Sequence, residues 1–250
     1  MSTPGTIRVG IGGWSYEPWR GVFYPPGLPH AREFEHAVNH VTTIEINATF
    51  YGRQKAASWS KWGAGAPDGF RFAVKGSRYC MTRPKLADAG DGIAQFFEQG
   101  MAELGDKLGP ILWQFAPSRR LDEADVAAFL ALLPDTLGEL PLRHVLEPRH
   151  VSFDDPAFVA LCREHNAAIA FADDETHPCI DVATADFAYA RLQRQREEIE
   201  TGYDAGELDG WAGKAREWAA DGRDTYVYMI NGAKLRAPAA AQAVLERLRV

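Results

Sequence analysis

Short apolar runs alternate with amphipathic stretches along the chain, which is the pattern of strands that alternate with helices. The short runs are rich in β-branched or aromatic residues and most end at a polar residue, a glycine or a proline. They predict eight strands, at residues 7–13, 42–51, 70–76, 110–117, 144–146, 168–174, 187–192 and 225–232. Helical spacing of apolar residues between them predicts helices near 30–40, 93–108 and 238–248, and others around Trp59, after Asp122, after Asp155 and around Trp211.

Eight short apolar strands separated by helices favour a closed parallel barrel over an open doubly wound sheet. Asp122 and the Asp155-Pro156 pair are typical helix N-terminal signals. The link between the sixth and seventh strands contains Pro178 and no helical pattern. With 250 residues, of which 46% are hydrophobic, the chain has the usual size of such a barrel. We therefore expect one α/β domain over residues 1–250, a single (β/α)8 barrel of the triosephosphate-isomerase (TIM) type that lacks a regular helix between strands six and seven.

Polar residues recur at the C-terminal ends of the predicted strands, the rim where active sites form in TIM barrels. They are Glu45, Lys75, Gln114, Glu147, Asp173, Arg191 and Asn231. The sequence therefore predicts a functional site at this rim.

The fifth strand ends in Glu147-Pro148-Arg149-His150, because a proline cannot donate to a sheet ladder. Glu147 could hold a proton or a bidentate partner, Arg149 could bind an anion, and His150 titrates near neutral pH. The alternative is a surface Glu–Arg pair beside an exposed histidine.

Two other strand ends and one loop carry unusual residues. Glu45 and Asn47 share one side of an extended strand, where they either form a site or satisfy the barrel interior. Lys75 is either a buried amine with a lowered pKa or a surface lysine. The glycines before Trp14 either cradle a phosphate or belong to a packed aromatic loop.

Composition limits the classes of binding partner that we expect for this chain. The net charge is −7 without a basic block, so nucleic acid is an unlikely partner. Cys80, Cys162 and Cys179 are odd in number and lack CxxC spacing, which fits a reducing cytosol and gives no metal cage. The first residues show no positively charged region followed by an apolar run, and no apolar stretch has the length of a membrane helix, so we expect neither a signal peptide nor a membrane span. We expect a cytoplasmic protein with a small-molecule ligand, no evident cofactor, no metal ligands and no membrane association; the oligomeric state stays open.

Several segments together also resemble domain-of-unknown-function family 72. They are Gly12-Gly13-Trp14-Ser15-Tyr16, Trp19-Arg20-Gly21-Val22-Phe23-Tyr24-Pro25, residues 45–51, residues 70–75, Leu112-Trp113-Gln114-Phe115-Ala116-Pro117 and Glu147-Pro148-Arg149-His150. The resemblance covers nearly the whole chain and implies a TIM-type barrel, but no established reaction.

The chain departs from the family pattern at three positions. Gln193 stands where relatives have a histidine, Ile230 where they have an asparagine, and Arg83 where they have the histidine of a Thr-His pair. The resemblance therefore does not carry over a mechanism that needs those histidines.

The leading hypothesis is an enzyme that acts by acid/base chemistry on a small anionic or polyhydroxylated, sugar-like molecule at this rim. Its reaction class stays open between hydrolase, isomerase and lyase. Glu147, with His150 or Glu45, would move a proton, and Lys75 is a further catalytic candidate. Substrate-binding candidates are Arg149, Arg191, Asn47, Gln114, Asp173, Asn231, Tyr51 and Trp14.

Other readings stay open. A non-catalytic ligand-binding or regulatory barrel is one, and a metal-assisted hydrolase using His150, Glu45, Glu147 and Asp173 is another, although HxH and HExxH spacings are absent. Glycosidase chemistry needs two carboxyls roughly 5 to 9.5 Å apart, which is doubtful for strands across the barrel. Schiff-base chemistry through Lys75, with Glu45 as proton carrier, is a further alternative.

Overall fold

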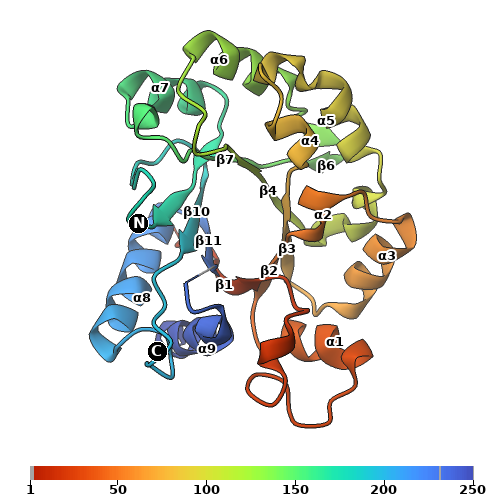
Figure 1. Cartoon of the computed structure of the whole chain (residues 1–250), viewed down its shortest axis with the longest axis vertical. Helices are drawn as coiled ribbons and strands as arrows, with labels where there is room; N and C mark the ends of the chain where they lie inside the picture. The colour runs from red at the N-terminus through yellow and green to blue at the C-terminus, as the bar shows by residue number, and fades with distance from the viewer. Residues whose placement is uncertain (1–2, 231, 250) are drawn as a thin grey trace.

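The strands form a closed ring with the helices outside it (Figure 1). This computed structural model describes residues 3–230 and 232–249. The ring strands are β1 (Ile7–Gly12), β2 (Thr43–Ile46), β3 (Arg71–Lys75), β4 (Leu108–Gln114), β7 (His144–Glu147), β8 (Ala168–Ile169), β9 (Phe171–Asp173), β10 (Phe187–Leu192) and β11 (Asp224–Met229). A separate hairpin pairs β5 (Thr136–Leu137) with β6 (Leu140–Pro141).

The ring is parallel throughout and has the order β8-β7-β4-β3-β2-β1-β11-β10-β9. Only Ala170 separates β8 from β9, which pair with β7 and β10 respectively. The two segments are therefore halves of the sixth barrel strand, and they close the ring. This confirms the predicted TIM-type barrel.

Helices cover the outside of the ring. The α-helices are α1 (Glu33–Val38), α2 (Ala48–Tyr51), α3 (Ala56–Gly65), α4 (Arg78–Met81), α5 (Gly90–Phe97), α6 (Glu123–Leu132), α7 (Pro156–Glu164), α8 (Ala205–Ala219) and α9 (Ala237–Leu248). Shorter 3-10 helices are η1 (Glu17–Trp19), η2 (His30–Arg32), η3 (Leu86–Ala89), η4 (Met101–Lys107), η5 (Val151–Phe153) and η6 (Lys234–Arg236). Asp122 and Asp155 cap α6 and α7 as predicted. Residues 174–186, all described, contain no helix, which confirms the expected gap before β10.

Two predicted boundaries are wrong. The strand predicted at 42–51 ends at Ile46, because Asn47 turns into helical backbone (φ −89°, ψ −17°) and α2 begins. The Thr49 hydroxyl holds this turn by donating to the carbonyls of Ile46 and Lys75. The helix predicted at 93–108 divides at Gly100, whose φ of 94° lies in the left-handed region, and β4 already begins at Leu108.

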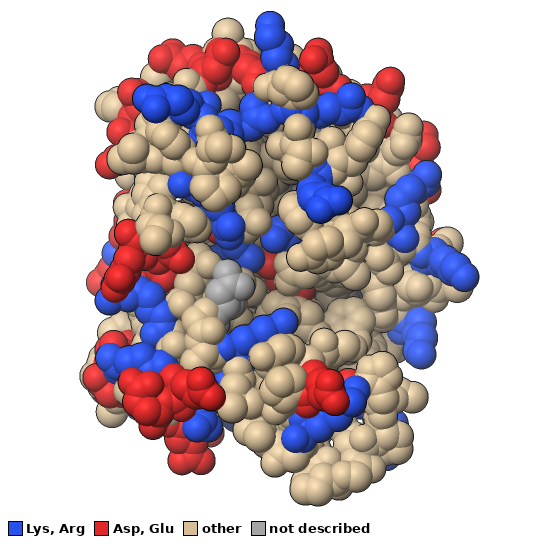
Figure 2. All heavy atoms as spheres, viewed as in Figure 1, with Lys and Arg blue, Asp and Glu red and all other residues tan. Residues whose placement is uncertain are grey.

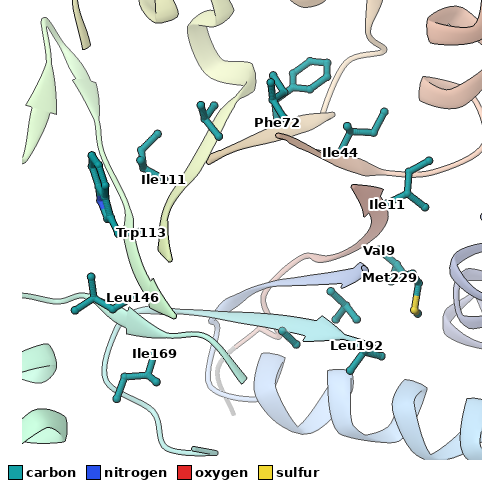
Figure 3. Close-up of a cluster of buried hydrophobic side chains, with 14 of the residues drawn as sticks. Val9, Ile11, Ile44, Phe72, Ile111, Trp113, Leu146, Ile169, Leu192 and Met229 are labelled. Atoms are coloured by element: carbon teal, nitrogen blue, oxygen red, sulfur yellow. The ribbon is translucent and has the colours of Figure 1, made fainter. Parts of the chain in front are cut away.

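Alternate residues of each strand face opposite sides, which decides what lies inside the barrel. Ile44, Phe72, Ile111 and Leu146 point away from the ring toward the helices (Figure 3). The interior cluster holds Ala73, Leu112, Val145, Ala168, Ala170, Phe187, Tyr189, Tyr226, Tyr228 and Ile230. The same alternation turns Glu45, Glu147 and Arg191 inward, toward the barrel axis.

Candidate functional site

Three charged side chains inside the barrel form what we call the buried ion triad: Glu45 on β2, Arg191 on β10 and Glu147 on β7. Nη1 of Arg191 lies 2.7 and 2.8 Å from the two carboxylate oxygens of Glu147. Its Nε and Nη2 each lie 3.1 Å from an oxygen of Glu45. All three side chains are buried. A single guanidinium therefore links two strands on different sides of the barrel.

Further side chains donate hydrogen bonds to the oxygens of both carboxylates. The Tyr189 hydroxyl donates to Glu45 Oε2 over 2.7 Å. Gln114 Nε2 donates to Glu147 Oε2 over 2.6 Å, and Arg149 Nη2 lies 3.3 Å from Glu147 Oε1. Buried charges are tolerated when they are paired and hydrogen-bonded, as here. Glu45 thus has hydrogen-bond partners for both carboxylate oxygens inside the barrel, and it also lies beneath the site.

These contacts set the charge state of Glu147. Burial alone would raise the pKa of this carboxyl, but the charges of Arg191 and Arg149 and the hydrogen bonds from Gln114 and Arg191 outweigh it, so its pKa lies below the ordinary value. Burial also opposes the charge of Arg191, yet Glu147 and Glu45 hold its pKa above the ordinary value. Glu147 is therefore an ionised carboxylate at neutral pH and a weak proton carrier.

A cavity of about 490 Å³ opens at the C-terminal end of the barrel. It is lined by Gly12, Gly13, Trp14, Ser15, Trp19, Ile46, Asn47, Ala48, Tyr51, Lys75, Gln114, Arg149, Arg191, Met229, Ile230 and Lys234. Four of these side chains are cations, whereas its described lining contains no aspartate or glutamate. Figure 2 shows blue lysine and arginine atoms gathered around the hollow at the centre of this face. The cavity is therefore electropositive on a chain whose net charge is −7.

Lys75 stands at the end of β3 and lines the cavity. Its Nζ lies 4.5 Å from the centroid of the Phe50 ring. No hydrogen bond or ion pair joins this amine to any residue in the described part of the chain. Burial, followed by the charge of Arg191, lowers the pKa of Lys75 to about 8, although Glu45 and Glu147 act in the opposite direction. Lys75 is thus a cavity amine that can lose its proton near neutral pH.

The loop after β1 forms an aromatic wall. Trp14 and Trp19 line the cavity, and Lys234 Nζ lies 4.4 Å from the centroid of the Tyr16 ring. The Gly13 amide donates to the carbonyl of Glu45 over 2.9 Å, so it is already used within the fold. The aromatic residues of this loop pack together, and Gly12 and Gly13 also line the cavity.

Two predicted site residues point elsewhere. His150 is absent from the cavity lining; its Nδ1 accepts from the Ser152 amide at 3.1 Å and caps η5. Asp173 lines a second cavity, of about 610 Å³, where the Tyr203 hydroxyl donates to it over 3.2 Å and Arg194 lies 3.7 Å away. Asn231 lies outside the described residues.

The remaining predicted residues gather in one place. Lys75, Gln114, Arg149, Arg191, Asn47, Tyr51 and Trp14 line the cavity, and Glu45 and Glu147 join them through the buried ion triad. Tyr51 does so from α2, with its side chain 78% exposed.

Sequence reasoning missed Tyr189 and Lys234. Tyr189 precedes Arg191 by two residues, so strand alternation already placed both on the same side. Lys234 follows the eighth strand in a loop without a distinguishing motif, and only the structure brings it to the cavity.

The three departures from the family pattern occupy different surroundings. Ile230 lines the cavity, so an apolar side chain stands there. Gln193 is buried just beyond β10. The Arg83 guanidinium lies 4.2 Å from the centroid of the Tyr79 ring.

Two features are absent from residues 3–230 and 232–249. No three histidine, cysteine, aspartate or glutamate side chains come together there as a possible metal site. None of the helices found there has the length and apolar character needed to cross a membrane.

Comparison with known proteins places this geometry in a family. The family model "Protein of unknown function DUF72" matches residues 8–250. UPF0759 protein YunF of Bacillus subtilis (strain 168) is 26% identical over 157 residues, which cover 61% of this chain and 54% of that protein. The match thus spans about half the length of this curated relative.

Solved structures show the same barrel. A DUF72 family protein from Thermotoga maritima MSB8 superposes with a TM-score of 0.80 at 22% identity, covering 98% of this chain and all of the other (100%). One from Enterococcus faecalis V583 gives 0.79 at 17%, covering 98% and 96%. D-psicose 3-epimerase, solved in the presence of D-fructose, gives 0.55 at 12%, covering 97% and 96%. With the family model matching nearly every residue, the chain belongs to the DUF72 family of proteins of unknown function.

Proposed function

We propose that this protein is an enzyme that binds a small anionic, polyhydroxylated molecule in the cavity above the buried ion triad and moves a proton with Lys75. The observation that carries the proposal is the charge of the cavity. Lys75, Arg149, Arg191 and Lys234 line it, and the two nearby carboxylates, Glu45 and Glu147, are already paired with Arg191. Two positive charges are left over, which favours an anionic ligand.

The other walls of the cavity support the proposal that the ligand carries hydroxyl groups. Gln114, Asn47 and Ser15 offer hydrogen-bonding groups, and the rings of Trp14 and Trp19 offer apolar faces. D-psicose 3-epimerase shares the barrel, but at 12% identity that likeness concerns the fold. The sugar-like substrate class therefore rests on the composition of this cavity.

Lys75 is the proton carrier that the charge states favour. General acid/base catalysis works best when the pKa of the group lies near the working pH. Burial brings the pKa of Lys75 to about 8, while that of Glu147 lies below its ordinary value. Glu147 then becomes a positioning residue that holds Arg191, Gln114 and Arg149 at the cavity floor.

Ligand binding can be tested by thermal shift against sugar phosphates, sugar acids and hydroxy acids. A ligand present at about a hundred times its dissociation constant should stabilise the protein by about 2.7 kcal/mol, or several degrees. We expect Arg149→Ala to remove most of this shift, measured against its own ligand-free melting temperature. Arg120→Ala, at an exposed arginine outside the cavity, is the matched control and should keep it. If no anionic compound shifts the wild type, the proposed site is wrong.

Turnover can be separated from binding by proton exchange. In deuterium oxide, a ligand found by thermal shift should lose a carbon-bound proton signal in proton NMR when the enzyme is present, because Lys75 would remove that proton. We expect exchange to fall by about a hundredfold or more in Lys75→Met, in line with loss of a general base. Binding without exchange in the wild type would instead favour the non-catalytic binding barrel.

A further inference from the structure

We propose that Lys75 forms a Schiff base with the carbonyl carbon of a small substrate that also carries an anionic group. This inference rests on the proposed function for its cavity and its anionic substrate class, and it replaces direct proton removal by Lys75 with activation of the substrate through a covalent bond to Lys75. Lys75 lines the cavity at the end of β3. The two carboxylates whose charges act on it, Glu45 and Glu147, are both paired with Arg191.

The surroundings of Lys75 differ from those of Lys107 and Lys214 and are similar to those of Lys234, whose Nζ lies over the rings of Tyr16 and Trp19. Lys107 Nζ donates to two backbone carbonyls, those of Gly63 and Ala66, over 2.7 and 2.6 Å. Lys214 is paired with Asp181 at 2.6 Å. Among described residues, Lys75 has the face of Phe50 and neither a hydrogen bond nor an ion pair. Its amine is therefore held in place while its lone pair, once deprotonated, is available to a ligand.

The same surroundings favour the neutral amine. Burial and the neighbouring charge of Arg191 lower the pKa of Lys75 to about 8, against 10.5 for an ordinary lysine. At neutral pH the nucleophilic form is then on the order of a hundredfold more abundant than for an exposed lysine. Desolvation beside another cation is a known way to activate a lysine for attack on carbonyls.

The step balances without an added reagent. The ammonium of Lys75 passes one proton to the carbonyl oxygen and its nitrogen bonds to the carbonyl carbon. The oxygen then leaves as water, carrying that proton and one further hydrogen from the nitrogen, which keeps its third hydrogen. The product is a protonated iminium that carries the same single positive charge. The charge balance above the buried ion triad therefore does not change. The iminium withdraws electrons from the adjacent carbon, so a neighbouring C–H or C–C bond can break.

The anionic group of the substrate would bind to other cations of the cavity. Arg149 and Lys234 line the same cavity, and two positive charges remain there when the two carboxylates are balanced against the four cations, although Arg149 Nη2 also lies 3.3 Å from Glu147. Their chemistry suits a carboxylate or a phosphate. A 2-oxo acid and a phosphorylated ketose both combine such a group with a carbonyl.

The test is reductive trapping in the full chain at pH 7. The protein is incubated with pyruvate or with dihydroxyacetone phosphate and with sodium cyanoborohydride, which reduces an iminium to a stable secondary amine. Peptide mass spectrometry then locates the adduct. We expect labelling of Lys75 to exceed that of the exposed Lys61 by about tenfold or more. Lys75→Arg, which keeps the charge, should lose the adduct, and Lys61→Met should keep it.

Each outcome decides a different point. Trapping with pyruvate alone supports a carboxylate substrate, and trapping with dihydroxyacetone phosphate alone supports a phosphorylated one. No adduct, or equal labelling of Lys75 and Lys61, overturns the Schiff base. Thermal shift with the same two probes distinguishes failure of the Schiff-base inference from failure of the proposed function. If the probes stabilise the protein without forming an adduct, only the Schiff-base inference fails. If no anionic compound in the screen binds, the proposed function fails as well.

Discussion

Replacing Arg191 with methionine is expected to destabilise the protein by about 3 to 5 kcal/mol, because it leaves two buried carboxylates without their cation. Glu45 and Glu147 are both fully buried, at 0% exposure, and each makes its closest charged contacts with Arg191. Chemical unfolding at pH 7 measures the loss. The deficit should shrink as the pH falls, since unpaired buried carboxyls have raised pKa values and become protonated.

Two controls show that the effect comes from burial. Arg32→Met breaks the exposed pair with Glu35 (3.0 Å) and should change the stability far less than Arg191→Met does. Adding Glu45→Gln and Glu147→Gln to Arg191→Met should recover part of the lost stability, because the uncompensated charges are gone. A loss in Arg191→Met no larger than in Arg32→Met would show that the triad is not the element that ties these strands together.

Replacing Lys75 with methionine is expected to have the opposite effect and to stabilise the protein at pH 7 by about 1 to 2 kcal/mol. A folded pKa of about 8 against 10.5 means that folding disfavours the charged amine. At 1.36 kcal/mol per pKa unit this penalty is roughly 3 kcal/mol. Screening and the lost contact with Phe50, about 0.5 to 1 kcal/mol, reduce the net gain.

The stability contribution of Lys75 changes with pH in a direction that follows from its lowered pKa. Between pH 8 and 10.5 the unfolded chain holds more protons on Lys75 than the folded one, so wild-type stability from this group rises with pH in that window. The penalty is fully present below pH 8 and gone above 10.5. The advantage of Lys75→Met should therefore disappear across this interval, measured by unfolding at several pH values. Lys61→Met, at an exposed position, should change stability little at any pH. A Lys75→Met variant that is less stable by the same amount at every pH would contradict the assigned charge state.

Taken together, these two variants separate what holds the barrel from what the cavity uses. Arg191, Glu45 and Glu147 are tolerated inside the barrel because their charges compensate one another, so removing one of them is costly. Lys75 lowers stability because its charge has no such partner, which is typical of groups retained for chemistry. The floor of the cavity therefore consists of paired charges, whereas the described contacts leave Lys75 and Lys234 in its lining without an ion pair.

The sequence by itself determined the eight strands, the helix caps at Asp122 and Asp155 and the gap before β10. These features depend on local properties: side-chain periodicity, the hydrogen bonds that a short polar side chain makes with its own backbone, and the shape of proline. It also determined that polar residues end the strands, and the barrel topology brings those ends together at one rim.

Only the tertiary structure decided how those polar residues pair. Arg191 meets Glu147 across 44 residues of sequence and Glu45 across 146, and no local pattern encodes such contacts. Likewise, His150 turns back to cap η5 and Asp173 lies in a separate cavity, although both stand at the predicted rim. The proton affinity of Lys75 depends on burial and on neighbouring charges, which exist only after the barrel closes. The sequence could therefore propose the members of the site, whereas their charges and partners follow from the three-dimensional packing that removes them from water.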